Sequence, residues 1–276
     1  MKVQRFAGNF KPTFWSEKVQ KELEKALIIA NWCNYEFDGE INYKERVKII
    51  GVVRPSVVDY VKGQDLTFEE LADNAQYLDI DHADAFGFKV FDFDKAQSNP
   101  KYLTAEMSEA AQALAEKEDA TIAKEAFEQS LTAMRSSSTD ISAETDPFDV
   151  IDAGIVKLYK NNVPATTELA ADLNPEHIML LKKKLASLFT DNVDYIKNSA
   201  VGKYNNCYLR MTNNLYNNGT DDMELIRTKK AVAVAGQINK IEHTDMENDF
   251  GVKIKGLNTY GVKVVRPKEL YIVKVH

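Results

Sequence analysis

The sequence predicts an α+β protein with a long projecting β-arm. Residues 46–61 are rich in Val and Ile, and residues 77–93 alternate apolar and charged side chains, as strands do. Between Pro100 and Pro147 the chain has neither Gly nor Pro, which favours one long helix. Residues 252–275 alternate again in the manner of strands. Strands and helices in this succession indicate an α+β fold.

Composition limits the class of protein. The 276 residues are 44% hydrophobic and 28% charged, which supplies a core and excludes wholesale disorder. Lys and Arg number 35 against 42 Asp and Glu, so the net charge of −7 does not indicate a dedicated nucleic-acid binder. Residues 64–100 hold nine acidic residues and two lysines, a difference equal to that whole net charge. Cys33 and Cys207 form no disulfide or metal pattern, so we expect two reduced, buried thiols.

The N-terminal part predicts a helix followed by the arm. A basic start is followed by large apolar residues at helical spacing, which are Trp15, Val19, Leu23, Leu27 and Ala30. No apolar stretch is long enough for a signal peptide or a membrane span, so we expect a soluble cytoplasmic product. Asp38-Gly39 makes a turn. Pro55 excludes a central place in a sheet for residues 46–61, so we expect the arm strand at an edge or in an exposed ribbon.

The long helix and two compact helices follow. Asn99-Pro100 is a good helix start, and an apolar stripe then continues to Met134. Ser136–Thr139 indicates a linker and a domain boundary. Asp146-Pro147 and Asn174-Pro175 each open a compact helix, and we expect His177, in the first turn of the second, to be solvated. The repeated Gly-Val-Lys at 251–253 and 261–263 indicates two arms of one hairpin.

No catalytic or metal-binding pattern is complete. The best metal candidate is Asp79-x-Asp81-x-x-Asp84, but a calcium loop that begins at Asp79 requires Gly at its sixth position and Glu at its twelfth. Those positions hold Asp84 and Val90, and strand alternation explains the exposed acids more simply. The sequence has no Gly-rich phosphate loop and no nucleophile elbow. We therefore expect no enzyme activity, no cofactor and no metal.

Nine short strings occur in a fixed order along nearly the whole chain. They are Phe14-Trp15-Ser16, Gly39-Glu40-Ile41, Val57-Val58-Asp59-Tyr60, Leu78-Asp79-Ile80-Asp81, Phe86-Gly87-Phe88-Lys89-Val90, Asp94-Lys95-Ala96-Gln97-Ser98, Asn162-Val163-Pro164, Gly256-Leu257 and Tyr260-Gly261-Val262-Lys263-Val264. In this order they resemble the major capsid (coat) proteins of tailed double-stranded DNA bacteriophages, whose architecture is called the Johnson fold. Each string is weak alone, and their order makes the resemblance specific.

The resemblance implies a division of the chain and a function. The implied parts are an N-terminal arm over 1–38, an extended β-hairpin loop over 39–90, a peripheral domain over 91–138 and 248–276 with a spine helix at about 100–134, and an axial domain over 139–247. The implied function is a structural capsid protein that self-assembles as hexamers and pentamers into an icosahedral shell around phage double-stranded DNA. Its implied location is the virion capsid, after synthesis and assembly in the bacterial host cytoplasm.

Contacts between subunits are expected in the first 70 residues. The expected contact residues are Lys2, Arg5, Lys11, Trp15, Arg46, Arg54, Asp59, Tyr60, Asp65, Glu69 and Glu70. The acidic segment 64–100 either faces the basic N-terminal arm of a neighbour or only keeps a projecting loop soluble. The expected partners are other copies of the chain, a separate scaffolding protein and a portal, with non-specific contact to packaged DNA and none to a membrane.

Three alternatives stay open. A host-encoded nanocompartment shell of the same fold would lie beside a cargo-enzyme gene, whereas a capsid gene lies near terminase and portal genes. A cytoplasmic enzyme built on carboxylates such as Asp92 and Asp94 would be a compact monomer or small oligomer with a deep pocket. A tail or connector protein would form a single ring.

Overall fold

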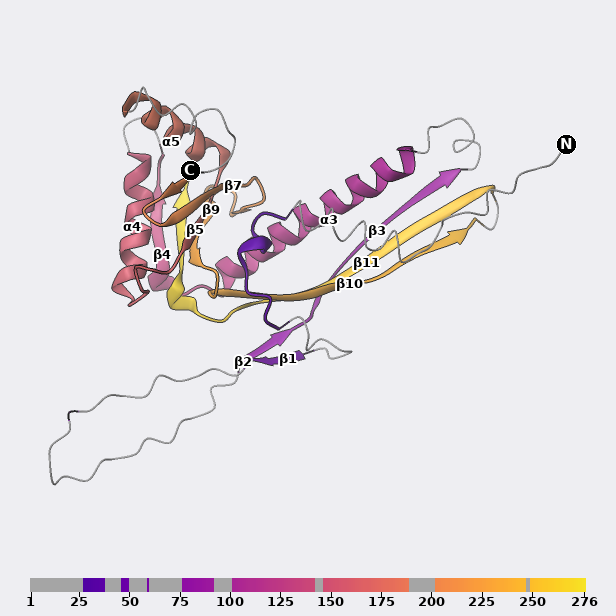
Figure 1. Cartoon of the computed structure of the whole chain (residues 1–276), viewed down its shortest axis with the longest axis horizontal. Coiled ribbons are helices and arrows are strands. Elements are labelled where there is room, and N and C mark those ends of the chain that lie inside the picture. Colours follow the sequence, from indigo (N-terminus) through magenta and orange to yellow (C-terminus); the bar gives the residue numbers. More distant parts are fainter. Residues whose placement is uncertain are drawn as a thin grey trace.

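The computed structural model describes residues 27–37, 46–49, 59, 76–91, 101–141, 146–188, 202–246 and 249–276. They form two parts, which we call the limb and the body (Figure 1). In the limb, the helix α3 (Lys101–Glu128) lies along the three-stranded sheet β10–β11–β3. In the body, the helices α4 (Pro147–Lys160) and α5 (Pro175–Leu188) lie beside a seven-stranded sheet. The predicted α+β class is confirmed.

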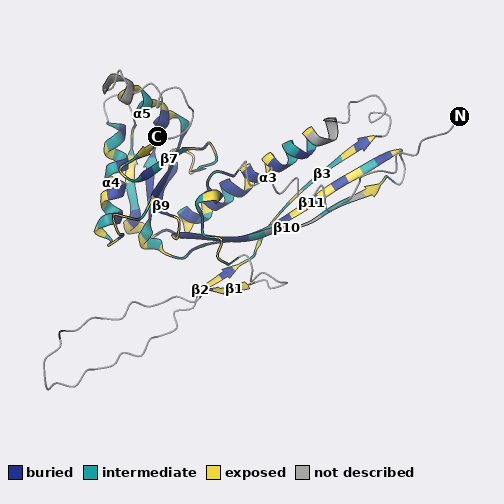
Figure 2. Ribbon diagram, in the orientation of Figure 1, coloured by how far each residue is buried: buried dark blue, intermediate teal, exposed yellow. Residues whose placement is uncertain are grey.

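The sheet of the limb is antiparallel. Its strands are β3 (His82–Phe91), β10 (Val232–Asp245) and β11 (Gly251–Val264). Figure 2 shows buried and exposed residues alternating along β11 and α3, and Phe86 and Phe88 of β3 pack against the core to which α3 contributes. The alternation predicted for β3 is therefore confirmed.

Two predictions about strand pairing are wrong. Both Gly-Val-Lys repeats lie on the one strand β11, because no turn interrupts 251–264, and the hairpin joins β11 to β10 instead. Residues 77–93 do not form one return strand of the arm. Only β2 (Gln76–Asp79) pairs with β1 (Arg46–Ile49), whereas β3 pairs with β11.

The helix α3 ends at Glu128, before the predicted end at 134. Arg135 explains the early end, because its guanidinium donates to the carbonyls of Phe127 (2.7 Å) and Ser130 (3.0 Å) and lies 4.3 Å from the Phe127 ring centre. Carbonyls in the last turn of a helix lack partners within the helix, so the arginine caps this end. Met134 is buried in the 3-10 turn η3 (Thr132–Met134) that follows.

The sheet of the body has the order β4–β12–β9–β5–β7–β6, with β8 paired to β9. Its strands are β4 (Arg135–Thr139), β5 (Leu169–Leu173), β6 (Lys203–Tyr204), β7 (Cys207–Met211), β8 (Tyr216–Asn217), β9 (Asp222–Thr228) and β12 (Leu270–Val275). The predicted linker at 136–139 is thus an edge strand, parallel to β12. The Ser136 hydroxyl accepts a hydrogen bond from the Lys274 amide (2.9 Å), so serine side chains help to hold this strand in place.

Both compact helices begin as predicted, but His177 is not solvated. Asp146 accepts a hydrogen bond from the Phe148 amide (3.1 Å), and Asn174 accepts one from the His177 amide (2.7 Å). The His177 side chain is fully buried, with Nδ1 2.8 Å from a Glu224 carboxylate oxygen. The first turn of α5 faces β9, so the solvated position expected for this histidine is wrong.

Strand pairing also crosses the predicted domain boundaries. The predicted axial range 139–247 includes β10, yet β10 pairs with β11 in the limb. The predicted peripheral range 248–276 includes β12, yet β12 pairs with β4 and β9 in the body. We describe the protein by limb and body, and its division into arm, loop, peripheral and axial domains stays a prediction.

Candidate assembly surfaces and the buried junction

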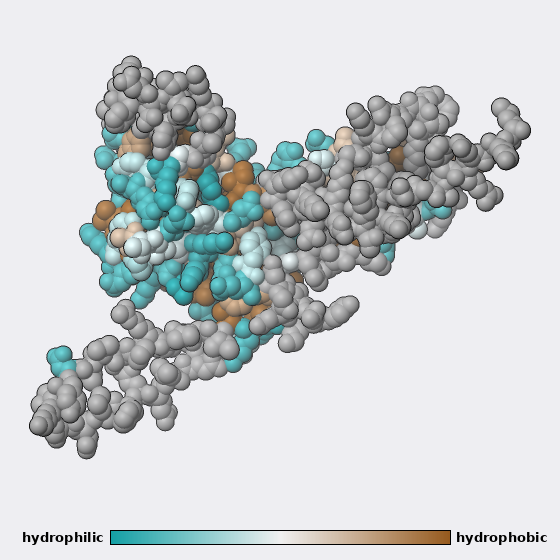
Figure 3. All heavy atoms as spheres, in the orientation of Figure 1, coloured by the Kyte–Doolittle hydropathy of each residue, from teal (hydrophilic) through white to brown (hydrophobic). Residues whose placement is uncertain are grey.

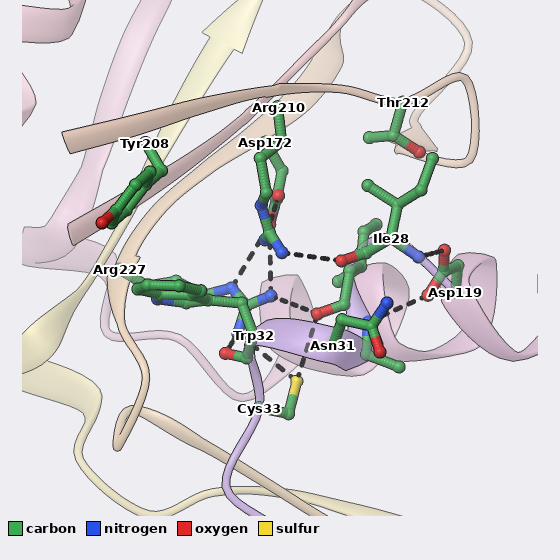
Figure 4. A network of polar contacts seen from close by, with 12 residues as sticks. Ile28, Asn31, Trp32, Cys33, Asp119, Asp172, Tyr208, Arg210, Thr212 and Arg227 are labelled. Atoms are coloured by element: carbon green, nitrogen blue, oxygen red, sulfur yellow. Dashed lines mark hydrogen bonds and ion pairs between the residues drawn. The ribbon is translucent and has the colours of Figure 1, made fainter. Parts of the chain in front are cut away.

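The segment 27–34 lies between the limb and the body and is bonded to both (Figures 1 and 4). On the limb side, the Asp119 carboxylate of α3 accepts hydrogen bonds from the amides of Ile28 (2.8 Å) and Ala30 (2.9 Å). A carboxylate from another helix therefore caps the 3-10 turn η1 (Ala30–Trp32). Burial raises the pKa of Asp119, and the backbone hydrogen bonds oppose that rise.

On the body side, Arg227 of β9 holds the same segment. Its fully buried guanidinium donates to the carbonyls of Ile29 (2.7 Å) and Trp32 (2.6 Å). It also lies 3.2 Å from the buried carboxylate of Asp172 on β5. The planar fork of an arginine can bond several acceptors at once, which offsets the cost of burying the charge.

A second arginine completes the network, which we call the junction. Arg210 of β7 donates to the Ile28 carbonyl (2.7 Å) and pairs with Asp172, so two guanidinium groups face this one carboxylate. Burial raises the pKa of the Cys33 thiol, and Arg227 beside it opposes the rise. A protonated, buried thiol is no nucleophile. Cys33 and Cys207 are both free and buried, as predicted.

The base of the arm rests on the limb. The pair β1–β2 buries Val47, Ile49 and Leu78 against Ala233 and Ala235 of β10. A two-stranded ribbon is marginal alone, so this apolar contact is what holds its described part in place. The apolar residues share one face of the ribbon, and the charged residues lie on the other.

Gly261 makes the close approach of β2 to β11 possible. A Cβ at this position would overlap the carbonyl oxygen of Asp79 and the side chain of Leu78. We expect Gly261→Ala to displace β2 and to speed amide hydrogen exchange over residues 76–79 by about tenfold or more. The control is Gly87→Ala on β3, where a Cβ meets nothing nearer than 3.7 Å. Equal exchange at 76–79 in the two variants would contradict the contact.

On the side away from α3, the pair β1–β2 covers part of the limb sheet, and two lysines lie exposed further along it. Lys89 of β3 lies directly opposite Lys253 of β11, and both side chains are exposed. Like charges in opposite positions destabilise a sheet, so an acidic partner on this face would stabilise it. At the end of the limb, Phe250 is 85% exposed, and Phe91 pairs with the neighbouring Gly251.

The structure describes two of the eleven predicted contact residues. Arg46 is exposed and pairs with Asp79, and its guanidinium carbon lies 5.1 Å from the Tyr77 ring centre. Asp59 is exposed. The other nine lie outside the described residues, and these are Lys2, Arg5, Lys11, Trp15, Arg54, Tyr60, Asp65, Glu69 and Glu70. The sequence reasoning missed the junction, although a lone charge in an apolar strand, as in Leu169–Leu173, was an available signal.

The described side chains offer no catalytic chemistry that we can identify. No group of three or more His, Cys, Asp or Glu residues in the described ranges could hold a metal ion. In the same ranges, no helix combines the length and the apolar character needed to cross a membrane. The charged groups of the junction are bonded to one another and to backbone, so they position chain segments. In Figure 3, hydrophobic side chains gather where the body meets the limb.

Comparison with known proteins identifies the fold. Neither a protein-family model nor a curated protein matches the sequence. A structure from Mycobacterium phage Che8 matches with a TM-score of 0.70 and 26% identity, over 90% of this chain and 90% of that one. The capsid of the cyanophage P-SCSP1u matches with a TM-score of 0.62 and 17% identity, over 84% of each chain.

An encapsulin shares the fold. The SrpI encapsulin of Synechococcus elongatus PCC 7942 matches with a TM-score of 0.57 and 10% identity, over 83% of this chain and 81% of that one. The phage likeness is the stronger one, and it covers both limb and body. The chain therefore has the fold of tailed-phage capsid proteins, and the capsid and encapsulin structures that it resembles are of structural shell proteins.

Proposed function

We propose that this chain assembles as hexamers and pentamers into the icosahedral capsid of a virion, around phage double-stranded DNA. The observation that supports this most is the likeness to the Che8 structure over 90% of both chains. We further propose that the protein is made and assembled in the bacterial cytoplasm, with a separate scaffolding protein and a portal as partners.

The contacts of such a shell would use the limb and the arm. A contact between two different surfaces, repeated by rotation, closes a ring when the angle fits. The exposed part of the limb sheet with Lys89 and Lys253 offers one such surface. Residues 64–100 of a neighbouring copy, with nine acidic residues and two lysines, have the complementary charge. The basic N-terminal residues are a second candidate partner for that acidic segment.

Charge removal in the acidic segment tests these contacts. We expect D65N/E69Q/E70Q to lower the yield of assembled particles several-fold at low salt, because complementary charge steers association most strongly there. The control is E106Q/E109Q/E116Q on α3, which removes the same charge from a described helix. Particle yield is measured by sedimentation at several salt concentrations. Assembly that is indifferent both to the acidic-segment variant and to salt would refute the charge contact.

Electron microscopy of the purified full chain tests the shell itself. Closed icosahedral particles with five-fold and six-fold capsomers are the expected result. Single rings would instead indicate a tail or connector protein, and small compact particles would contradict shell formation.

A nanocompartment shell is the second candidate, favoured by the encapsulin likeness at a TM-score of 0.57. Both candidates predict closed particles, so the contents decide between them. Particles isolated from the native source should hold double-stranded DNA if the protein is a phage capsid protein. A protein cargo in place of DNA, and a cargo gene in place of terminase and portal genes, would favour the nanocompartment.

A further inference from the structure

Six basic side chains from three separate segments lie where the body meets the limb. They are Lys157 and Lys160 at the end of α4, Lys229 and Lys230 in the turn from β9 to β10, and Arg266 and Lys268 in the connection from β11 to β12. We call them the basic patch. Lys157 is half-buried, and the other five residues are exposed. In Figure 1 the three segments meet at the lower end of the body.

Backbone contacts fix the three segments against one another. The Asn161 side-chain amide donates to the Lys268 carbonyl (3.2 Å), which joins the end of α4 to the β11–β12 connection. The Ala231 carbonyl accepts from the amides of Val265 (2.9 Å) and Arg266 (3.2 Å), which joins that connection to the β9–β10 turn. The six charges therefore belong to one surface, although up to 111 positions separate them along the sequence.

The patch has a large excess of positive charge. Within 157–161, 228–231 and 265–269, Glu269 is the one acidic residue. It is already bonded by Arg266 (2.9 Å) and by the Thr228 hydroxyl (2.6 Å). None of the five lysines has an ion-pair partner among the residues that the structure describes. The dipole of α4 accounts for the two lysines in its last turn, but not for those of the other two segments.

The composition of the patch favours a nucleic acid over a protein as its partner. Protein interfaces are depleted in Lys and enriched in aromatic residues and Met, and no exposed large apolar side chain belongs to these three segments. Lysines on flexible stems suit phosphates as point charges, without reading the bases. We propose that the basic patch contacts the phosphate backbone of duplex DNA without sequence preference. This inference rests on the proposed function, which supplies the DNA.

The test uses K160Q/K230Q/K268Q, which removes one charge from each segment. The unassembled fraction of the full chain is titrated with a short DNA duplex of mixed sequence at a series of salt concentrations. Each phosphate contact contributes about 0.9 to the slope of log affinity against log salt, so the slope should become shallower by about 2 to 3. The control K117Q/K182Q/K183Q removes the same charge from α3 and α5 and should keep the wild-type slope.

The outcomes separate this inference from the proposed function. Equal slopes of log affinity against log salt for the two variants would overturn the proposal that the basic patch binds DNA. The absence of measurable affinity of the wild type for the duplex would overturn it too. So would loss of shell assembly by K160Q/K230Q/K268Q with DNA affinity kept, since the patch would then be a protein interface. A wild-type protein that forms no shell would refute the proposed function, whatever its affinity for DNA. If the wild type forms shells but K160Q/K230Q/K268Q binds DNA as tightly as the wild type, the role of the basic patch is refuted and the proposed function is not.

Discussion

Arg227→Met is expected to lower the free energy of unfolding by about 3–5 kcal/mol, because it leaves the buried Asp172 carboxylate with one guanidinium partner fewer. It also removes the donors to the carbonyls of Ile29 and Trp32, so the segment 27–34 should loosen. Urea denaturation of the unassembled chain gives the energy. Hydrogen exchange at residues 28–34 shows whether the loss is local or global.

Two comparisons make the Arg227 experiment specific. Arg266→Met removes a half-exposed arginine that pairs with Glu269, and it should cost no more than about 1 kcal/mol. The double variant R227M/D172L should be less destabilised than the sum of its single variants, because both single variants break the same buried ion pair between Arg227 and Asp172. Additive losses, or a loss in Arg227→Met no larger than in Arg266→Met, would show that the junction does not stabilise the fold as described.

The stability of the body is expected to fall as pH rises above neutrality, through His177. Burial by itself lowers the pKa of this imidazole, but the hydrogen bond and charge of Glu224 and the Pro147 carbonyl outweigh burial and raise it. A folded-state pKa above the unfolded value of about 6.5 means that the extra stability is complete below that pH. It is lost as pH rises through the folded-state value.

Glu224→Gln should remove that dependence on pH. The variant keeps the shape of the side chain but not its charge, so the curve of unfolding free energy against pH should flatten above pH 6.5. It should also lose about 3 kcal/mol or more at pH 6, where the wild-type ion pair is intact. The control is His276→Gln, on a histidine at the chain end that is 46% exposed, and it should keep the wild-type slope. A flat wild-type curve between pH 6 and 9 would contradict the account.

Local signals predicted local structure well. The starts of α4 and α5 follow from Asp-Pro and Asn-Pro, because a cap and the residue after it act within one turn. The alternation along β3 is local too, and its burial agrees. Those predictions needed no knowledge of the remainder of the chain.

Pairing over long distances was not predictable in the same way. The partner of β3 is β11, some 170 positions later, and nothing in either strand specifies the other. His177 looked solvated because the Glu224 that buries it lies 47 positions away. The lone charges of Asp172 and Arg227 in apolar strands indicate buried partners, but not which residues those partners are.

The length of the limb magnifies any rotation between limb and body at its far end. The described chain passes between body and limb through three short stretches, 129–134, 229–231 and 265–269. The strands β10 and β11 have 14 residues each, so the far end lies about 45 Å from these crossings. Each degree of rotation at the crossings then moves that end by about 0.8 Å, at the same strand rise. Copies that differ by a few degrees at this pivot would place Phe250 several ångströms apart.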